Sequence, residues 1–301
     1  MQKTIFLLLL LCHVGLLAQN NVTLHCIVEN KGSGTLTLHK NNYFIGPQVA
    51  EPFSKQSNNQ FACVFNLDRN RIVQFHCNNK SAEIYLEPGD SLKFILDEKT
   101  FPATLQFSGK GAANNTFLFK FNQTFKNEFE KAFMEHRITS TTVDAYEMAA
   151  FNDRKKEKAF LMDYAEKNQL SAGFKTYLSQ LIEYNYWNYL LAYPIVNANS
   201  NKGLTVNPLP AVMLENFDKS RVGNDTALIA SSYRSFLSYF VTYFVSEANG
   251  FNKFTDLATS MQKKYYFANQ NLKNEAFRFY LANYLYDECE KNPAEAVKKN
   301  F

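Results

Sequence analysis

The spacing of apolar residues changes once along the chain, and this change restricts the fold more than any other feature. From Val22 to about Phe107, apolar and polar residues alternate, as they do in half-buried strands. From Ala112 onward, apolar residues recur at the period of an amphipathic helix. Short strands followed by helices predict an α+β fold, with an antiparallel sheet or sandwich over residues 20–110 and a helical domain over residues 111–301.

Four segments of the strand region each place their apolar residues on one face. These residues are Val22, Leu24, Cys26 and Val28; Phe61, Cys63, Phe65 and Leu67; Val73, Phe75 and Cys77; and Leu92, Phe94 and Leu96. Between the last two segments, Pro88 presets its own φ and Gly89 accepts a positive φ, as a type II turn requires. The stretch YLEPGDSLKFIL therefore predicts a hairpin.

Two cysteines of the strand region invite a disulfide interpretation. Pairing the apolar face of residues 61–67 with that of residues 73–77 in an antiparallel hairpin opposes Cys63 to Cys77 around Asn70. That register makes a disulfide between Cys63 and Cys77 sterically allowed. Neighbouring registers that keep the same residues on the buried face are equally allowed, and buried reduced cysteines are common. A disulfide and two reduced thiols are therefore both open alternatives.

The helical region divides into several apolar stripes. The first is predicted to be continuous and contains Phe117, Leu118, Phe121, Phe125, Phe129, Ala132 and Phe133. Ser171 is a predicted N-cap, and Asp225 is a predicted N-cap of a helix that carries Ile229 and Phe236. A last helix is expected from about Asn271 to Glu290, and the Pro, Asn, Ser and Gly residues between Tyr193 and Pro210 predict a long connection.

The N-terminus is typical of a secretory signal peptide at residues 1–19. Lys3 precedes a short apolar run, and small or polar residues follow at Ala18 and Gln19. Lipidation at Cys12 is a less favoured alternative, because Leu11 stands where a lipid-attachment motif has a small residue. We expect a periplasmic or otherwise exported protein without a transmembrane segment after the signal peptide, since no later run reaches the ~20 apolar residues of a spanning helix.

The charge balance argues against a nucleic-acid partner. The chain has 32 basic and 28 acidic residues, and removal of Lys3 with the signal peptide leaves 31 against 28. Such a balance lacks the excess of Lys and Arg that nucleic-acid binding requires, whereas an envelope protein or a peptide is an acceptable partner.

Motifs that would identify a reaction are missing from the sequence. No Cys-x-x-Cys pair, structural-zinc spacing or Gly-x-Ser-x-Gly motif occurs, and the stretch SGKGAANNT departs from a phosphate-binding loop at Leu105 and Gly111. The sequence therefore predicts no catalytic residue, no cofactor and no metal ligand. An enzyme whose site is assembled from distant residues remains an open alternative.

Two stretches of the sequence carry a resemblance to a known family. IYLEPGDSLKFILD followed by LQFSGKGAANNTFLFKF resembles the N-terminal region of TlpA-like thiol-disulfide oxidoreductases of the Gram-negative cell envelope. The matching residues are Pro88, Gly89, Asp90, Gly109, Gly111 and Asn114. In that family a thioredoxin-like domain with a Trp-Cys-x-x-Cys motif follows, whereas here the only tryptophan, Trp187, precedes Asn188.

The resemblance implies a non-catalytic scaffold or partner-binding portion of an exported thiol-disulfide oxidoreductase, with the thioredoxin domain missing from this chain. The stretch AEAVKKNF after Pro293 predicts the start of another helix, so we expect the helical domain to be incomplete at its C-terminus. The alternative function is a free-standing periplasmic or secreted binding protein for a small molecule or peptide. In that alternative, we expect the sheet–helix interface and the loop at residues 193–210 to form its pocket.

Overall fold

The computed structural model describes residues 21–292, except residues 31, 33, 41, 42, 44, 46–48 and 202–204. The predicted signal peptide, Cys12 and the predicted helix after Pro293 lie outside the described residues. The chain divides into two compact units. The strand-rich unit comprises Tyr164–Phe174 and the described residues within Met1–Asn42 and Pro47–Thr124. The helical unit comprises the described residues within Tyr43–Gly46, Phe125–Asp163 and Lys175–Phe301.

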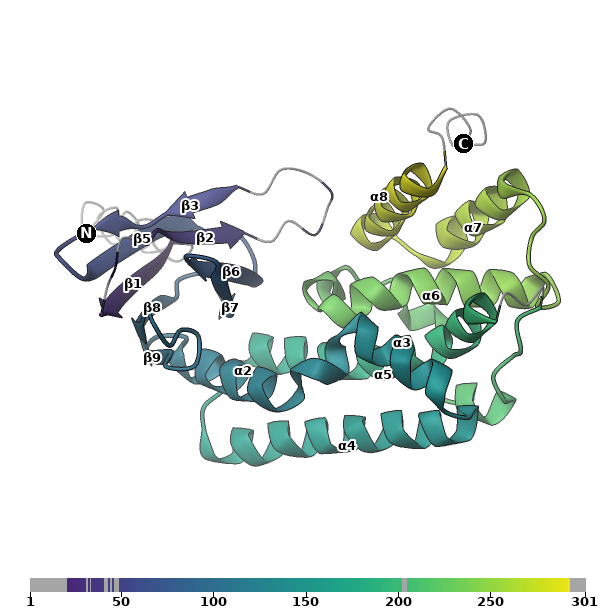
Figure 1. Cartoon of the computed structure of the whole chain (residues 1–301), viewed down its shortest axis with the longest axis horizontal. Coiled ribbons are helices and arrows are strands. Elements are labelled where there is room, and N and C mark those ends of the chain that lie inside the picture. The colour runs from purple at the N-terminus through teal and green to yellow at the C-terminus, as the bar shows by residue number, and fades with distance from the viewer. Residues whose placement is uncertain are drawn as a thin grey trace, which may run out of the picture. The chain divides into compact units, whose positions relative to one another are not determined.

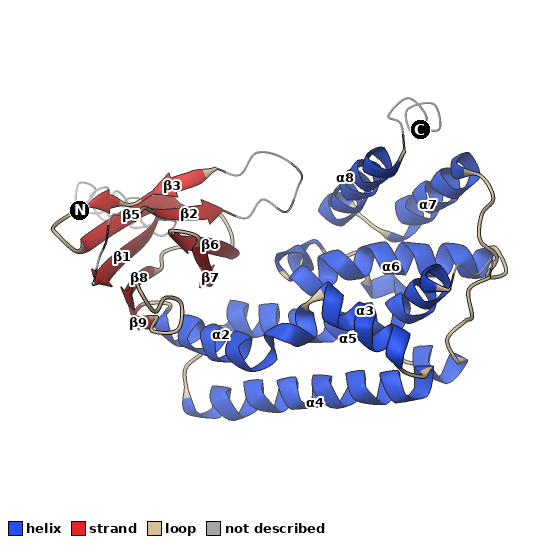
Figure 2. Ribbon diagram, viewed as in Figure 1, coloured by secondary structure: helices blue, strands red, loops and turns tan. Residues whose placement is uncertain are grey.

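Two sheets form the strand-rich unit, and both are mostly antiparallel (Figures 1 and 2). Among the described residues, the first sheet has the order β4-β5-β1-β8-β9 and the second has the order β3-β2-β6-β7. The strands of the first are β4 (Ser54–Lys55), β5 (Gln60–Asn66), β1 (Asn21–Glu29), β8 (Ser91–Asp97) and β9 (Gln106–Gly109). Those of the second are β3 (Ala50–Pro52), β2 (Leu36–Lys40), β6 (Arg71–Cys77) and β7 (Lys80–Leu86). The central pair β1 and β8 runs parallel.

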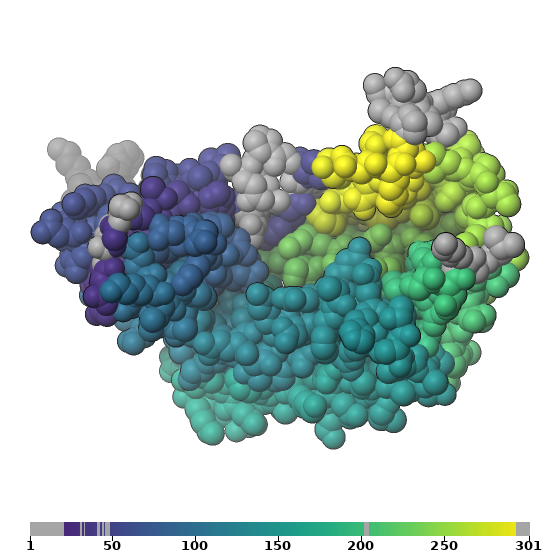
Figure 3. All heavy atoms as spheres, in the orientation of Figure 1, coloured from purple at the N-terminus to yellow at the C-terminus, as the bar shows by residue number. Residues whose placement is uncertain are grey.

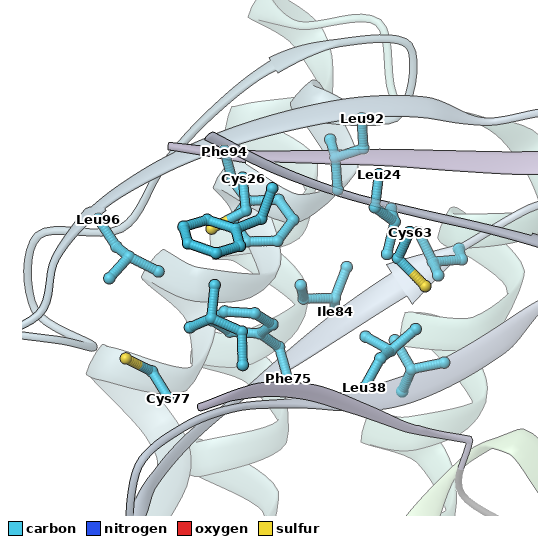
Figure 4. Packing of buried hydrophobic residues seen from close by; sticks show 14 of the residues in the cluster. Leu24, Cys26, Leu38, Cys63, Phe75, Cys77, Ile84, Leu92, Phe94 and Leu96 are labelled. Atoms are coloured by element: carbon cyan, nitrogen blue, oxygen red, sulfur yellow. The ribbon is translucent and has the colours of Figure 1, made fainter. Parts of the chain in front are cut away.

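The predicted strand faces form the core between the two sheets. All the apolar residues assigned to these faces are buried, and Figure 4 shows several of them side by side. Phe75 of β6 meets Phe94 of β8 edge-on, with ring centroids 4.9 Å apart, so the contact joins one sheet to the other. The alternating residues therefore form the sandwich-like N-terminal part, and the helical region that follows it makes the fold α+β, as predicted.

The predicted hairpin at residues 85–96 is wrong in its pairing. The turn itself is present, because the Asp90 N–H donates to the Glu87 carbonyl at 3.1 Å and Gly89 has φ +78°. However, β7 and β8 belong to different sheets, so the turn carries the chain from one sheet to the other. Alternation specifies which face of a strand is buried, and it does not specify the neighbour to which the strand is hydrogen-bonded.

Of the two alternatives left open for Cys63 and Cys77, the structure has the reduced thiols, because the two cysteines belong to different sheets. Cys63 lies opposite Leu24 in the first sheet, and Cys77 lies opposite Leu36 in the second. Both cysteines are buried thiols and no disulfide joins them. Figure 4 shows their sulfur atoms at separate places in the core.

Helices follow the sheets, beginning with α2 (Ala112–Phe125), η2 (Lys126–Phe129), α3 (Lys131–Ser140), α4 (Val143–Lys167) and α5 (Ala172–Ser200). The stripe predicted to run from Phe117 to Phe133 is interrupted, because α2 ends at Phe125 and Phe133 of α3 is 38% exposed. The connection predicted from residue 193 begins later, because α5 continues through Pro194 to Ser200 and the described residues 205–210 are not helical. Proline removes one helical hydrogen bond, and burial of the flanking apolar residues, including Leu191 and Ile195, offsets this loss.

The remaining elements are η3 (Ala211–Leu214), η4 (Lys219–Arg221), η5 (Asp225–Ile229), α6 (Ser231–Ala248), α7 (Leu257–Asn271) and α8 (Asn274–Lys291). The last three helices pack on one another, and Figure 3 shows the atoms of α8, in yellow, against those of α7. Helix α8 matches the predicted last helix closely. Within the part of the chain that is described, no helix is both long and apolar enough to span a membrane.

The two predicted caps have different outcomes. Ser171 caps α5 as expected, because its Oγ accepts a hydrogen bond from the Phe174 N–H at 3.1 Å. Asp225 does not cap the helix that follows it. Its Oδ1 instead accepts from the Ala276 N–H at 2.9 Å, in the first turn of α8. The predicted role of Asp225 is therefore wrong, because α6 begins at Ser231 and the Asp225 carboxylate binds a helix that is distant in the chain.

Candidate binding groove in the helical unit

The six residues that carry the family resemblance meet in one junction of the strand-rich unit. The Asp90 carboxylate accepts from the Glu87 N–H at 2.9 Å, and a Cβ on Gly111 would lie 2.9 Å from it. Burial raises the pKa of Asp90 to about 6, although the hydrogen bond from Glu87 opposes the shift. Gly109 and Gly111 have φ of +87° and +94°, which favours glycine at both positions.

Asn114 extends this junction to the segment that precedes α5. Its Oδ1 accepts from the Ser171 N–H, and its Nδ2 donates to the Ser171 Oγ, both at 3.1 Å. Glu87, which precedes Pro88, accepts from the same Ser171 hydroxyl at 2.8 Å. These residues connect the sheets to α2 and to residues 164–174, so the structure gives them a structural role within the strand-rich unit.

A groove of about 830 Å³ lies in the helical unit. Helices α4 and α5 form two of its walls, and residues 216–224 form the third. This volume is within the range of ~300–1,000 Å³ that small-molecule sites usually have. The lining residues are Lys158, Leu161, Met162, Lys175, Thr176, Ser179, Gln180, Ile182, Glu183, Tyr184, Trp187, Asn216, Phe217, Asp218, Arg221, Val222 and Asn224.

Aromatic rings form the apolar part of the groove. Trp187 of α5 and Phe217 meet edge to face with ring centroids 4.9 Å apart. Phe217 also stacks on Phe244 of α6, with ring centroids 5.6 Å apart, and this contact holds the Phe217 ring in place. Trp187 is the only tryptophan of the chain. These rings give the groove a rigid surface for a flat or aliphatic ligand.

Glu183 organises one side of the groove. Its carboxylate accepts from the Lys158 Nζ at 2.7 Å, from the Arg154 Nη1 at 3.2 Å and from the Trp187 Nε1 at 3.1 Å. The Arg154 guanidinium also lies over the Tyr186 ring, 3.8 Å from its centroid. One carboxylate therefore holds two cations and the indole in a defined arrangement.

The groove also carries a cation, Lys175 of α5. Among the described residues, Lys175 has no ion-pair partner. Arg221 is paired with Asp218 at 3.1 Å, but both side chains are largely exposed, so this pair contributes little stability. A groove with an aromatic surface and an available ammonium group suits a ligand that has an apolar body and an anionic end.

None of the groove residues was predicted as a site from the sequence. The run YNYWNY at residues 184–189 lies within α5. Its aromatic density was the one signal that could have suggested a binding surface. Phe217 comes thirty positions after Trp187 along the chain, so their contact has no local signature.

A scan against protein-family models and a search of curated proteins give no match to this chain. In the described part of the chain, no group of His, Cys, Asp or Glu side chains is placed to hold a metal ion.

Proposed function

We propose that this chain is a non-catalytic binding module of the cell envelope. Its groove binds a small molecule or a short peptide segment that has an apolar body and a carboxylate or similar anionic end. The observation that carries this proposal is the aromatic surface of Trp187 and Phe217 in the same groove as Lys175, which has no ion-pair partner among the residues that the structure describes. The groove lies within the helical unit and is not the pocket beside residues 193–210 that the sequence suggested.

The lining of the groove supports binding rather than catalysis. The described lining residues include no histidine and no cysteine, so Thr176 and Ser179 have no imidazole there to activate them as nucleophiles. Glu183 is occupied by three donors. The side chains of the groove thus favour recognition of a ligand over its chemical conversion.

The tryptophan in the groove provides a direct test. Because Trp187 is the only tryptophan, tryptophan fluorescence of the purified chain reports on this groove alone. We expect decanoate to change the emission in a saturable way. Decyltrimethylammonium, which has the same apolar body and the opposite charge, should bind more weakly. Equal responses to both ligands, or none to either, would contradict the proposal.

A pair of lysine variants separates the charge of the groove from the net charge of the protein. Lys175→Gln should weaken decanoate binding by about threefold, which is the effect of one solvent-exposed ion pair. Lys155→Gln removes an exposed lysine of α4 that does not line the groove, and it should leave the affinity unchanged.

The resemblance to TlpA-like proteins supports a second proposal, in which the chain is the partner-binding portion of an exported thiol-disulfide oxidoreductase. Three of the four described thiols, those of Cys26, Cys63 and Cys77, are buried, which suits a non-catalytic role, and the exposed Cys289 has no second cysteine near it in the sequence. Burial raises the pKa of Cys63 to about 11, which disfavours the reactive thiolate. We expect no reduction of insulin disulfides by this chain. Turnover that is lost in Cys63→Ala would contradict this expectation.

A further inference from the structure

A second, much smaller cavity lies inside the helical unit. Its volume is about 10 Å³, which is room for a single water molecule. Three carboxyl groups line it, from Glu128 of η2 and from Asp153 and Glu157 of α4. The other lining residues are Ala150, Arg154, Asn185, Tyr186 and Tyr189.

Two of these carboxyl groups have a buried oxygen without a hydrogen-bond partner. Glu157 is only 1% exposed, and its Oε1 has no partner among the described residues. The Oε2 of Glu128 is likewise buried without a partner in the described part of the chain. Burial of an ionised carboxylate without compensating hydrogen bonds is costly, whereas a protonated carboxyl avoids most of this cost.

The cations around the cavity are already engaged by other carboxylates. Arg137 of α3 donates to Asp153 at 2.8 Å, and Lys156 lies 3.8 Å from the same carboxylate. Arg154 and Lys158 of α4 both pair with Glu183 of α5. The phenols of Tyr186 and Tyr189 donate elsewhere, to the Glu147 carboxylate and to the Glu128 carbonyl. Within the described part of the chain, Glu128 and Glu157 thus form no ion pair of their own.

We propose that Glu128 and Glu157 form one proton-binding site inside the helical unit, and that loss of the bound proton rearranges Arg154 and so alters the surroundings of Trp187 in the groove. The ligand of this site is a proton, which the solvent supplies and takes up. The effect on Trp187 needs no groove ligand, so the proton site does not depend on the proposed function of the groove.

The pKa values of the two groups are consistent with this assignment. The pKa of Glu157 is raised to about 8, mainly by burial and also by the negative charges of Glu128 and Asp153, while Lys158 opposes the shift. The pKa of Glu128 is raised to about 7, mainly by burial and also by Asp153, while Lys156 and Arg137 oppose the shift. Interacting acids of this kind release their protons in two steps, and the two pKa values belong to the pair.

Arg154 is the physical connection between the cavity and the groove. It lines the cavity, and it lies one helical turn before Glu157 on α4, where the two side chains can approach each other. Its Nη1 is 3.2 Å from the Glu183 Oε1, and the same oxygen accepts from the Trp187 Nε1 at 3.1 Å. When Glu157 ionises, its charge attracts Arg154 away from Glu183, and the hydrogen bond to Trp187 changes with it.

The test is the pH dependence of Trp187 fluorescence in the full chain without added ligand. We expect a transition with a midpoint between about pH 7 and pH 8 in the wild type. Glu157→Gln mimics the protonated acid and should abolish this transition. Glu166→Gln changes an exposed glutamate of the same helix and should preserve it. A wild-type emission that is constant across this range would overturn the proposal, as would a transition that persists in Glu157→Gln.

Infrared spectroscopy of the wild type supplies a second measurement that needs no folded variant. A protonated carboxyl has a carbonyl band that an ionised carboxylate lacks. We expect such a band at pH 7, where Asp90 with its pKa of about 6 is mostly ionised, and its loss by pH 9, over the range of the fluorescence transition. Absence of the band at pH 7 would refute the proton site. Decanoate binding is measured separately, so failure of the groove proposal would leave both of these results unaffected.

Discussion

Asn115 of α2 completes the edge of the second sheet, and its removal should destabilise the strand-rich unit. β7 is an edge strand of that sheet, and the main chain of Tyr85 within it is buried. The Asn115 Oδ1 accepts from the Tyr85 N–H, and its Nδ2 donates to the Tyr85 carbonyl, both at 2.8 Å. One side chain, itself 1% exposed, thus occupies the place of a neighbouring strand.

The expected cost follows from these two hydrogen bonds. Asn115→Ala removes the side-chain partner of one buried donor and one buried acceptor. Each buried polar group that loses its partner costs about 1–3 kcal/mol, so we expect the free energy of unfolding to fall by about 4 kcal/mol. Asn115→Asp keeps the acceptor but replaces the Nδ2 that donates to the carbonyls of Tyr85 and Gly111. This variant should also be strongly destabilised, because a carboxylate would face two carbonyl oxygens.

Urea denaturation followed by circular dichroism measures the loss, and hydrogen exchange of the peptide that contains β7 locates it. Asn122→Ala is the matched control on the same helix. Its side chain makes an exposed hydrogen bond to Glu83 at 3.2 Å, and the change should cost less than about 0.5 kcal/mol. A loss below about 1 kcal/mol for Asn115→Ala, with unchanged exchange in β7, would refute the assignment of Asn115 as a strand substitute.

Three further predictions concern other parts of the chain. The folded pKa of Glu157 is raised above its unfolded value, so the free energy of unfolding should fall as pH rises from about 4.5 to about 8. In urea titrations across this range, Glu157→Gln should make that fall smaller by on the order of 4 kcal/mol. With iodoacetamide at pH 8, the exposed Cys289 should be alkylated in the native chain, whereas the buried Cys63 should be alkylated only after denaturation. Mass spectrometry that detects rapid alkylation of both cysteines in the native chain would contradict this. Asp225→Ala should lower the free energy of unfolding of the helical unit by about 1 kcal/mol, because the first turn of α8 loses its cap, and faster hydrogen exchange should appear there rather than in α6.

Much of the fold could be predicted from residues that are close together in sequence. The alternation from Val22 to Phe107 identified the strand faces, and these faces are buried as expected. The turn at Gly89 and the cap at Ser171 were also correct, because each depends on conformations and hydrogen bonds that span only a few residues. By itself, therefore, the sequence determined the class of the fold, the order of its sheet and helix regions, and the identity of its strand core.

Tertiary structure alone decided how these segments are paired and which sites they form. β5 pairs with β1, and β6 pairs with β2, although a hairpin of β5 with β6 would bury the same residues. The groove places Trp187 against Phe217, and the small cavity brings Glu128 to Glu157. A periodic pattern records only that a side chain is buried. The partner against which it is buried depends on how distant segments pack together, and this packing determines whether a buried aromatic ring or acid completes a core or forms part of a site.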